Sequence, residues 1–179
     1  MSTLILMMGL PGAGKSTWAK SHMKDNDIYI SRDEIRFSLV DENEEYFSKE
    51  INVFDQFVTS INEALTEGFA PAVYADATHL NRVSRQKLLN RITAPYDRLE
   101  IIFINADVNI CLRQNEKRKG TRAYVPRGVI RRMALSLEEP CFREGKWCYD
   151  VITIVSAEEY RYGERHEIVM RVEANPEKE

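Results

Sequence analysis

The 179-residue chain lacks the run of about 18 apolar residues that a membrane-spanning helix needs. Its beginning, a polar Met-Ser-Thr followed by a short apolar run, also lacks the basic start and longer apolar stretch of an export signal. Cysteine is scarce, and the odd number and spacing of Cys111, Cys141 and Cys148 indicate neither a disulfide framework nor a zinc site. We therefore expect a protein of the reducing cytoplasm that makes no membrane contact.

Neither sign of charge dominates the chain, which carries 25 basic and 28 acidic residues and a net charge of −3. The basic residues are unevenly distributed, because segment 113–132 holds eight of them and a single acidic residue, a net of +7 that leaves −10 for the remainder. A positive segment on an acidic body predicts a polyanionic ligand such as a nucleic acid. The alternative is that these arginines serve a nucleotide alone.

The clearest motif follows the first apolar run, Leu4–Met8. Residues 9–17, Gly-Leu-Pro-Gly-Ala-Gly-Lys-Ser-Thr, fit the pattern G-x-x-x-x-G-K-[ST]. In a strand–loop–helix of this kind, backbone N–H groups surround phosphates, the lysine reaches the β- and γ-phosphates, and the serine hydroxyl holds Mg²⁺. We therefore predict a site for ATP or another nucleoside triphosphate, with Mg²⁺ as cofactor. Its predicted nucleotide-binding residues are Gly9, Gly12, Ala13, Gly14, Lys15, Ser16 and Thr17.

Apolar runs alternate with amphipathic helical stripes along the chain, which predicts a parallel sheet covered on both faces. We expect one domain, 1–179, of the α/β class: a P-loop NTPase of the kinase type, with about five parallel strands between helices and a basic helical lid at about 113–132. Segment 138–149 shows no clear pattern, and 174–179 is expected to be a loose tail. The predicted strands are 4–8, 28–30, 71–75, 99–104 and 151–155, with an edge strand at 166–172. The stripe expected to be buried in one long helix is Phe47, Ile51, Phe54, Val58, Ile61 and Leu65.

Polar segments follow the first three predicted strands, at the sheet edge where ligands of such folds gather. Ser31 and Glu34 form a capping box that starts a helix, which leaves Asp33 without a structural role. Asp33 and Arg36 are three residues apart and therefore share one side of this helix. The carboxylate is placed to accept a proton from an attacking hydroxyl and the guanidinium to hold an anionic group of the acceptor. The ordinary alternative is an acid that favours the helix dipole beside a surface arginine.

The third predicted strand ends on Asp76, in the manner of a Walker-B acid, which predicts a Mg²⁺ ligand beside Ser16. The alternative is a capping or loop carboxylate. Thr78 and His79 follow, and a loop histidine such as His79 is more often a bystander than a ligand.

The basic segment contains a loop between two predicted helices, as a mobile lid over a nucleotide does. Arg118 and Arg122 are the candidates for a cation that reaches the transferring phosphoryl group, where charge develops in the transition state. A static loop with solvated arginines is the alternative.

Four of these segments together resemble the kinase domain of the bacteriophage polynucleotide 5′-hydroxyl kinase family. The resemblance covers residues 4–137, whereas the phosphatase signature of that family is absent. Relative to the family pattern, Ala77 and Lys119 look like additional residues. The matching segments are 9–17, Ser-Arg-Asp-Glu-Ile-Arg (31–36), Asp-Ala-Thr-His-Leu-Asn (76–81) and Asn-Glu-Lys-Arg-Lys-Gly-Thr-Arg-Ala-Tyr-Val-Pro (115–126).

The resemblance implies a role for each matching side chain. Lys15 and Ser16 bind phosphates and Mg²⁺, Asp33 is the general base on a 5′-hydroxyl, and Arg36 holds the neighbouring phosphate of the acceptor. Arg118 reaches the donor phosphates, and Asp76 matches the acid after the third strand.

The function predicted from the sequence is ATP-dependent phosphorylation of the 5′-hydroxyl end of DNA or RNA. Two alternatives remain open: a kinase of small molecules or mononucleotides, and a non-catalytic or ATPase-type nucleotide-binding module. No protein partner is indicated. The predicted catalytic residues are Asp33, Lys15 and Arg118, and the predicted substrate-binding residues are Arg36, Asp76 and Thr78.

Overall fold

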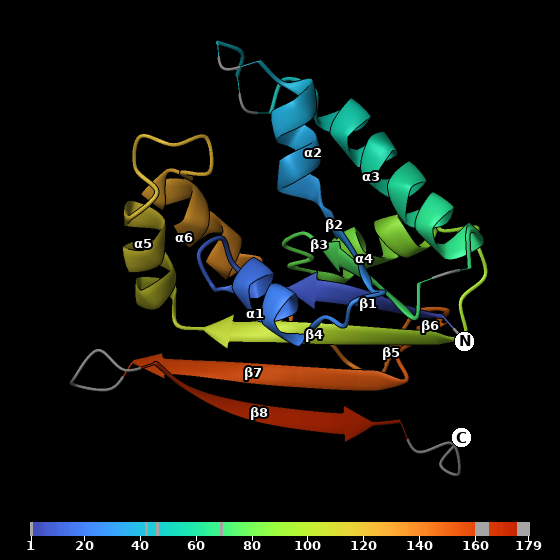
Figure 1. Cartoon of the computed structure of the whole chain (residues 1–179). Helices are drawn as coiled ribbons and strands as arrows, with labels where there is room; N and C mark the ends of the chain where they lie inside the picture. Colours follow the sequence, from blue (N-terminus) through green and yellow to red (C-terminus); the bar gives the residue numbers. More distant parts are fainter. Residues whose placement is uncertain (1, 42, 46, 69, 160–164, 175–179) are drawn as a thin grey trace.

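The core of the protein is a six-stranded sheet in the order β2-β3-β1-β4-β7-β8 (Figure 1). The structure, a computed structural model, describes residues 2–41, 43–45, 47–68, 70–159 and 165–174. In this order, the strands from β2 to β7 run parallel to one another, and β8 runs antiparallel to β7 at the edge. The prediction of a parallel α/β sheet is therefore confirmed, with a sixth strand at the predicted edge. The strands are β1 (Thr3–Met8), β2 (Ile28–Ser31), β3 (Ala72–Asp76), β4 (Arg98–Ala106), β7 (Val151–Glu159) and β8 (Arg165–Glu173).

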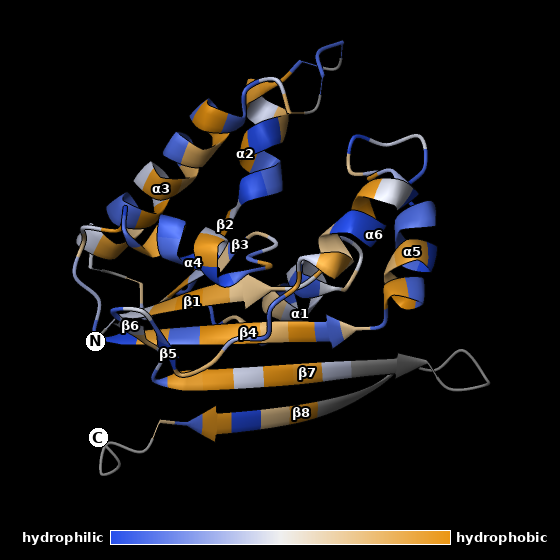
Figure 2. Ribbon diagram, turned by 180° about the vertical axis from the view of Figure 1, so that it is seen from behind, coloured by the Kyte–Doolittle hydropathy of each residue, from blue (hydrophilic) through white to orange (hydrophobic). Residues whose placement is uncertain are grey.

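Helices cover both faces of the sheet, because the side chains of each buried strand alternate between two apolar clusters. In β1, Leu4 and Leu6 join the cluster under α3 and α4, whereas Ile5 and Met7 join the cluster under α1, α5 and α6. Figure 2 shows the resulting apolar colouring of β1, β4 and much of β7. None of the helices in the described residues combines the length and apolarity needed to cross a bilayer. The helices are α1 (Lys15–His22), α2 (Arg32–Leu39), α3 (Glu50–Thr66), α4 (Arg82–Leu89), α5 (Val108–Glu116) and α6 (Arg127–Leu135).

The start of α2 agrees in part with the predicted capping box. The Glu34 N–H donates to Ser31 Oγ at 3.3 Å, which makes Ser31 the N-cap. The Glu34 carboxylate, however, lies 3.4 Å from Lys20 Nζ on α1 rather than serving as the second arm of the box. The cap turns the chain sharply from β2 into α2, so that Asp33 emerges in the first helical turn beside the carboxyl end of β2.

The prediction that Phe47 and Ile51 belong to the buried stripe of a helix is wrong. α3 begins at Glu50, so Phe47 precedes the helix, and the two side chains are 52% and 78% exposed. Burial on α3 begins only with Val53 and Phe54, because the first turn of the helix extends beyond the sheet beside α2 (Figure 1).

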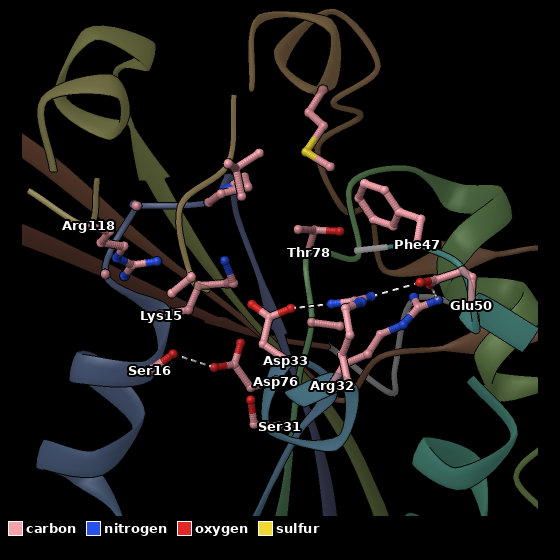
Figure 3. Close-up of a pocket in the computed structure, with 18 residues that line it drawn as sticks. Lys15, Ser16, Ser31, Arg32, Asp33, Phe47, Glu50, Asp76, Thr78 and Arg118 are labelled. Atoms are coloured by element: carbon pink, nitrogen blue, oxygen red, sulfur yellow. Dashed lines mark hydrogen bonds and ion pairs between the residues drawn. The ribbon is translucent and has the colours of Figure 1, made fainter. Parts of the chain in front are cut away.

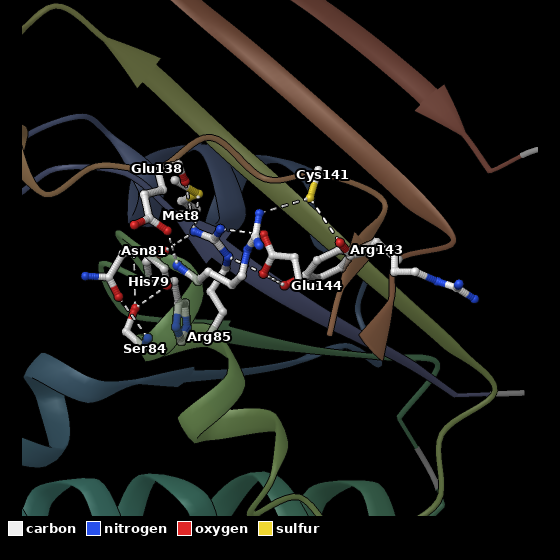
Figure 4. A network of polar contacts seen from close by, with 11 residues as sticks. Met8, His79, Asn81, Ser84, Arg85, Glu138, Cys141, Arg143 and Glu144 are labelled. Carbon is white, nitrogen blue, oxygen red and sulfur yellow. Dashed lines mark hydrogen bonds and ion pairs between the residues drawn. The ribbon is translucent and has the colours of Figure 1, made fainter. Parts of the chain in front are cut away.

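Segment 138–149, which the sequence left without a pattern, is fixed by a buried ion pair (Figure 4). It forms a small hairpin, β5 (Arg143–Glu144) and β6 (Trp147–Cys148), whose Glu144 is fully buried. Arg85 of α4 is equally buried and donates to Glu144 through Nε at 2.9 Å and Nη2 at 2.5 Å. Its Nη1 donates to the His79 carbonyl at 2.9 Å and the Glu138 carbonyl at 3.1 Å. Arg85 thereby joins the hairpin to the loop that follows β3.

Candidate active site

A pocket lies at the carboxyl ends of β1, β2 and β3, the edge predicted to bind ligands (Figure 3). Its walls come from the glycine loop, from α2 with the start of α3, from the loop after β3 and from the predicted lid. The predicted site residues among its lining are Gly12, Gly14, Lys15, Ser16, Asp33, Arg36, Asp76, Thr78 and Arg118. Gly9, Ala13, Thr17 and Arg122 are predicted nucleotide-binding residues that do not belong to the lining.

The glycine loop has the backbone of a phosphate cradle. Gly12 and Gly14 have φ angles of 82° and 103°, a left-handed conformation that favours glycine, and Gly14 is the N-cap of α1. A Cβ on Gly12 would lie 2.5 Å from the Cys111 carbonyl, and one on Gly9 would lie 2.8 Å from the Ile104 carbonyl. Gly9 therefore serves close packing against β4, and the N-terminus of α1 opens into the pocket, where an anion is stabilised.

Lys15 is the buried cation of the loop. Its Nζ donates to the carbonyl oxygens of Gly9 and Leu10, each at 3.0 Å. Burial lowers the pKa of Lys15, whereas the negative charges of Asp76 and Asp33 oppose that shift. Asp76 and Asp33 therefore both act on this ammonium group, and Figure 3 shows Lys15, Asp33 and Asp76 gathered around the same space.

Asp76 ends β3 and is almost fully buried. Its Oδ2 accepts a hydrogen bond from Ser16 Oγ at 2.7 Å and a second from the hydroxyl of Tyr29 on β2. Burial, together with the Asp76 charge, raises the pKa of Tyr29, which keeps the phenol a donor. Tyr29 could not be identified from sequence patterns, because its contact with Asp76 depends on the pairing of β2 with β3.

The oxygen atoms of Ser16 and Asp76 fit a Mg²⁺ site. Mg²⁺ is a hard cation that takes oxygen ligands and is usually held by one or two carboxylates, substrate phosphates and water. The described residues contain no cluster of three or more histidine, cysteine and acidic side chains, so a closed cage of protein ligands is not built there. One carboxylate and one hydroxyl beside a phosphate loop match the open arrangement instead.

Opposite the glycine loop, Arg36 is held between two carboxylates. Its Nη1 donates to Asp33 at 2.5 Å and its Nη2 to Glu50 Oε2 at 2.9 Å. The guanidinium also lies over the ring of Phe47, 5.5 Å from the centroid. Glu50 binds Arg32 as well, so the first residue of α3 connects two arginines of α2. Sequence reasoning missed Glu50 and Phe47, which lie in a different segment from the motif that they support.

The side chains of Asp33 and Arg36 differ in exposure to solvent, which suits different roles. The Asp33 side chain is 60% exposed, and it points into the pocket (Figure 3). The Arg36 side chain is 6% exposed, so that only part of its guanidinium is open to a ligand. An open carboxylate beside a buried, fixed guanidinium can act on a hydroxyl while the acceptor's own anionic group is held.

The predicted lid consists of the end of α5, a loop at 117–126 and the start of α6. Arg118 lines the pocket, and its positive charge contributes to the lowered pKa of Lys15, which places both cations at the same end. Arg122 points elsewhere: its guanidinium donates to backbone carbonyls at the end of α2. The exposed basic side chains of the segment are Arg113, Lys117, Lys119, Arg127, Arg131 and Arg132.

Thr78 and His79 differ in position. Thr78 lines the pocket, and its carbonyl accepts the Gly9 N–H at 3.1 Å, which ties the loop after β3 to the glycine loop. His79 is buried away from the pocket, 3.3 Å from the Ala75 carbonyl, to which Nε2–H donates. Burial lowers the pKa of His79 to about 3, so the ring is neutral and has no acid–base role at neutral pH.

Comparison with known proteins identifies a family and several relatives. A family model described as an AAA domain matches residues 4–140. The chain is 28% identical over 180 residues to the L-seryl-tRNA(Sec) kinase of Methanococcus maripaludis, covering 96% of this chain and 66% of that protein. The chain thus spans just under two thirds of that relative's length.

Solved structures share the fold. A chain of the Pnkp1/Rnl/Hen1 RNA repair complex superposes with a TM-score of 0.62 at 23% identity, covering 76% of this chain and 44% of that one. A sugar kinase from a Janibacter species gives a TM-score of 0.58 at 13% identity, covering 87% and 86% of the two chains. At these identities the structures establish the fold and leave the acceptor open.

Proposed function

The chain belongs to the AAA-domain family of P-loop kinases, and we propose that it transfers the terminal phosphoryl group of ATP, or of another nucleoside triphosphate, to the 5′-hydroxyl end of DNA or RNA. Family membership makes the chain a phosphotransferase with a nucleotide as phosphate donor. The proposal concerns the acceptor and the residues that act on it.

The observation that carries the proposal is the pairing of Asp33 with Arg36 opposite the glycine loop. An acceptor kinase needs a base for its hydroxyl, and the exposed Asp33 carboxylate is available to one. A sugar presents hydroxyls around this point, whereas a polynucleotide end presents a phosphate next to its terminal nucleoside. A buried arginine, fixed by Glu50 on the side away from Asp33, matches a phosphate-bearing acceptor.

The residues around the glycine loop position the phosphates of the nucleotide donor and supply positive charge. Lys15 and the N–H groups around Gly12 and Gly14 hold the donor phosphates, and Arg118 faces the charge that develops on the transferred group. Ser16 and Asp76 would hold Mg²⁺, which when bound neutralises charge on the donor phosphates. Asp33 accepts the proton of the acceptor hydroxyl as its oxygen forms the new bond to phosphorus, and the nucleoside diphosphate leaves.

The exposed basic side chains of segment 113–132 support a polyanionic acceptor. They belong to the same segment as Arg118, Ala123 and Val125, which line the pocket. Each lysine or arginine that neutralises a phosphate releases a counterion, so binding of a nucleic acid weakens steeply as salt is raised. A small neutral acceptor would show little of this dependence.

A second acceptor is favoured by one specific observation. The curated relative that shares 28% identity over nearly the whole chain is a kinase of L-seryl-tRNA(Sec), whose name places the acceptor on an RNA. Transfer to an aminoacyl hydroxyl carried by tRNA would use the same donor end and the same base. It would differ in what Arg36 contacts.

The test is an acceptor panel with γ-labelled ATP and Mg²⁺: 5′-hydroxyl RNA, 5′-hydroxyl DNA, the same oligonucleotides bearing a 5′-phosphate, seryl-tRNA and free nucleosides. The proposal predicts label on the 5′-hydroxyl oligonucleotides and none on their 5′-phosphate controls. Label on seryl-tRNA alone would replace the first acceptor by the second. Label on nucleosides alone would make the protein a small-molecule kinase, and ATP hydrolysis without any transfer would make it a nucleotide-binding module.

A further inference from the structure

Arg122 connects the lid to the helix that carries the acceptor residues. Its Nη1 donates to the Phe37 carbonyl at 3.0 Å and its Nη2 to the Val40 carbonyl. The guanidinium also lies 5.2 Å from the centroid of the Phe37 ring. These partners are more than 80 residues away in sequence, at the C-terminal end of α2, so the contact joins two separate walls of the pocket.

The end of α2 is a suitable binding site for an arginine. The last carbonyl groups of a helix lack partners within the helix, and they carry its negative dipole end. The Asp41 N–H, four residues after Phe37, donates to the Glu44 carboxylate at 3.0 Å, so the Phe37 carbonyl accepts from Arg122 instead of from the helix. The planar fork of arginine supplies two donors to the two carbonyls, which a lysine cannot reproduce.

The loop that carries Arg122 also carries Arg118, and its own hydrogen bonds keep the two together. Asn115, which is fully buried, closes the base of the loop by donating to the Val125 carbonyl at 2.7 Å and accepting the Val125 N–H at 3.0 Å. Thr121 donates to the Arg118 carbonyl through its hydroxyl at 2.7 Å and its N–H at 2.9 Å. Because the loop is pinned at its base and braced within, a displacement of Arg122 also displaces Arg118.

We propose that Arg122 is a positioning residue that latches the lid onto the C-terminal end of α2, so that Arg118 faces the donor phosphates while the same helix presents Asp33 and Arg36 to the acceptor. This role differs from the direct nucleotide contact predicted from the sequence. It rests on the proposed kinase function only for its consequence for phosphoryl transfer, since the latch itself is a contact between two parts of this chain.

The first test measures the latch without any acceptor. Amide hydrogen exchange of residues 117–125 is compared among the wild-type protein, Arg122→Ala, Arg122→Lys and Lys119→Ala. Lys119 is the matched control, because it is a basic residue of the same loop whose side chain is 74% exposed. The proposal predicts faster exchange in Arg122→Ala, a smaller change in Arg122→Lys and none in Lys119→Ala. Wild-type exchange in Arg122→Ala, or an equal increase in the Lys119 control, overturns the latch.

The second test asks whether Arg122 acts through Arg118. With ATP and the acceptor identified by the panel, Arg122→Ala is expected to lower kcat about 10- to 100-fold, as a small misplacement of a catalytic group does. Arg118→Ala is expected to lower it about 100- to 1,000-fold. The double variant should then be no slower than Arg118→Ala, within about threefold, because the effects of coupled residues do not add. If the rate loss of the double variant equals the product of the two single losses, Arg122 does not act through Arg118.

The two tests also separate the latch from a direct phosphate contact and from failure of the function. If Arg122 bound an acceptor phosphate, Arg122→Ala would raise the acceptor KM and weaken its salt dependence while leaving hydrogen exchange unchanged. If the wild-type protein transferred phosphate to no acceptor, the proposed function would fail while the exchange comparison would still decide the latch. Should Arg122→Ala lower the melting temperature until the protein unfolds, Arg122→Lys replaces it in both comparisons.

Discussion

Arg36 donates a hydrogen bond of 2.5 Å to Asp33, one turn away on α2, so the proposed base and the proposed acceptor clamp are a bonded pair. Glu50 fixes the other end of the same guanidinium. The pair is a local feature of one helix, whereas its support comes from a different one. The proposed chemistry requires Asp33 to act as the base while Arg36 holds the acceptor.

Arg36→Lys is predicted to raise the KM of an acceptor that bears a phosphate next to its terminal nucleoside by about 10- to 100-fold, because a hydrogen-bonded charge contributes about 1.5–3 kcal/mol. The KM of a plain nucleoside, however weak an acceptor it is, should change little. Steady-state kinetics with a nucleoside 3′-phosphate and the matching nucleoside measure the difference. Arg91→Lys, in an exposed ion pair on α4's C-terminal side, is the control, and equal effects on both acceptors would remove Arg36 from the acceptor site.

Tyr29→Phe is predicted to raise the Mg²⁺ concentration that transfer requires rather than to abolish transfer. The variant removes the phenol that donates to Asp76 and keeps the ring, so the carboxylate remains beside Ser16 with less orientation. Loss of such a supporting partner typically costs about 10- to 100-fold in metal affinity. The measurement is a Mg²⁺ titration of nucleotide binding, which needs no acceptor. Tyr96→Phe is the control, and matching titrations of both variants would show that Tyr29 does not orient Asp76.

Arg85→Met is predicted to destabilise the fold by about 3–5 kcal/mol, because it leaves the carboxylate of Glu144 buried without its partner. Arg91→Met, whose ion pair with Asp55 is about half exposed, should cost no more than about 1 kcal/mol. Urea unfolding of both variants gives the comparison. The double variant Arg85→Met with Glu144→Leu should recover part of the loss, since no unpaired charge remains, and a double variant as unstable as the single one would contradict this explanation.

His79 is predicted to make the protein less stable in acid. Burial lowers its pKa from 6.5 to about 3, so the folded protein binds the proton less readily than the unfolded chain. The stabilisation from the neutral ring is therefore complete above about pH 6.5 and is lost as the pH falls toward 3, by up to about 1.4 kcal/mol per pH unit. Urea unfolding across this range should show a shallower acid slope for His79→Asn than for wild type. Asparagine suits the φ of 44° at this position.

His22→Asn, on the exposed face of α1, is the control for this titration. It should retain the wild-type slope. An acid slope that is the same in wild type, His22→Asn and His79→Asn would mean that other groups are responsible for the loss of stability.

Features of the fold and site that depend on residues close together in the chain are predictable from the sequence, and those that depend on distant residues are not. The glycine loop, the Ser31 cap and the Asp33/Arg36 pair depend on neighbouring residues. The strands are recognisable because β1, β3 and β4 each contain an unbroken apolar run. Tyr29 and Glu50 could not be identified in this way. Their roles arise from the pairing of β2 with β3 and from the packing of α3 against α2, which bring together residues distant in the chain.

In other places the local sequence pattern suggests a different environment from the one that the structure shows. Phe47 continues the helical spacing of the α3 stripe, yet it precedes the helix and joins the pocket. Arg122 lies in a basic loop beside the nucleotide site, yet its guanidinium is bound by the end of α2. Segment 138–149 is rich in charged and aromatic residues, so no hairpin is evident from its sequence. Its Glu144 can be buried because Arg85 forms an ion pair with it.

The most direct test of the account is the single-turnover rate of phosphoryl transfer by Asp33→Asn, at saturating ATP and 5′-hydroxyl oligonucleotide, with the ATP Kd measured on the same protein. Asparagine keeps the shape of the side chain and a contact to Arg36 but is not a base. If Asp33 is the base, the rate falls by about 10²- to 10⁴-fold while the ATP Kd stays within about twofold of wild type, and the surface control Asp55→Asn shows no loss. A wild-type rate in Asp33→Asn would contradict the assignment of Asp33 as the base, and with it the central claim.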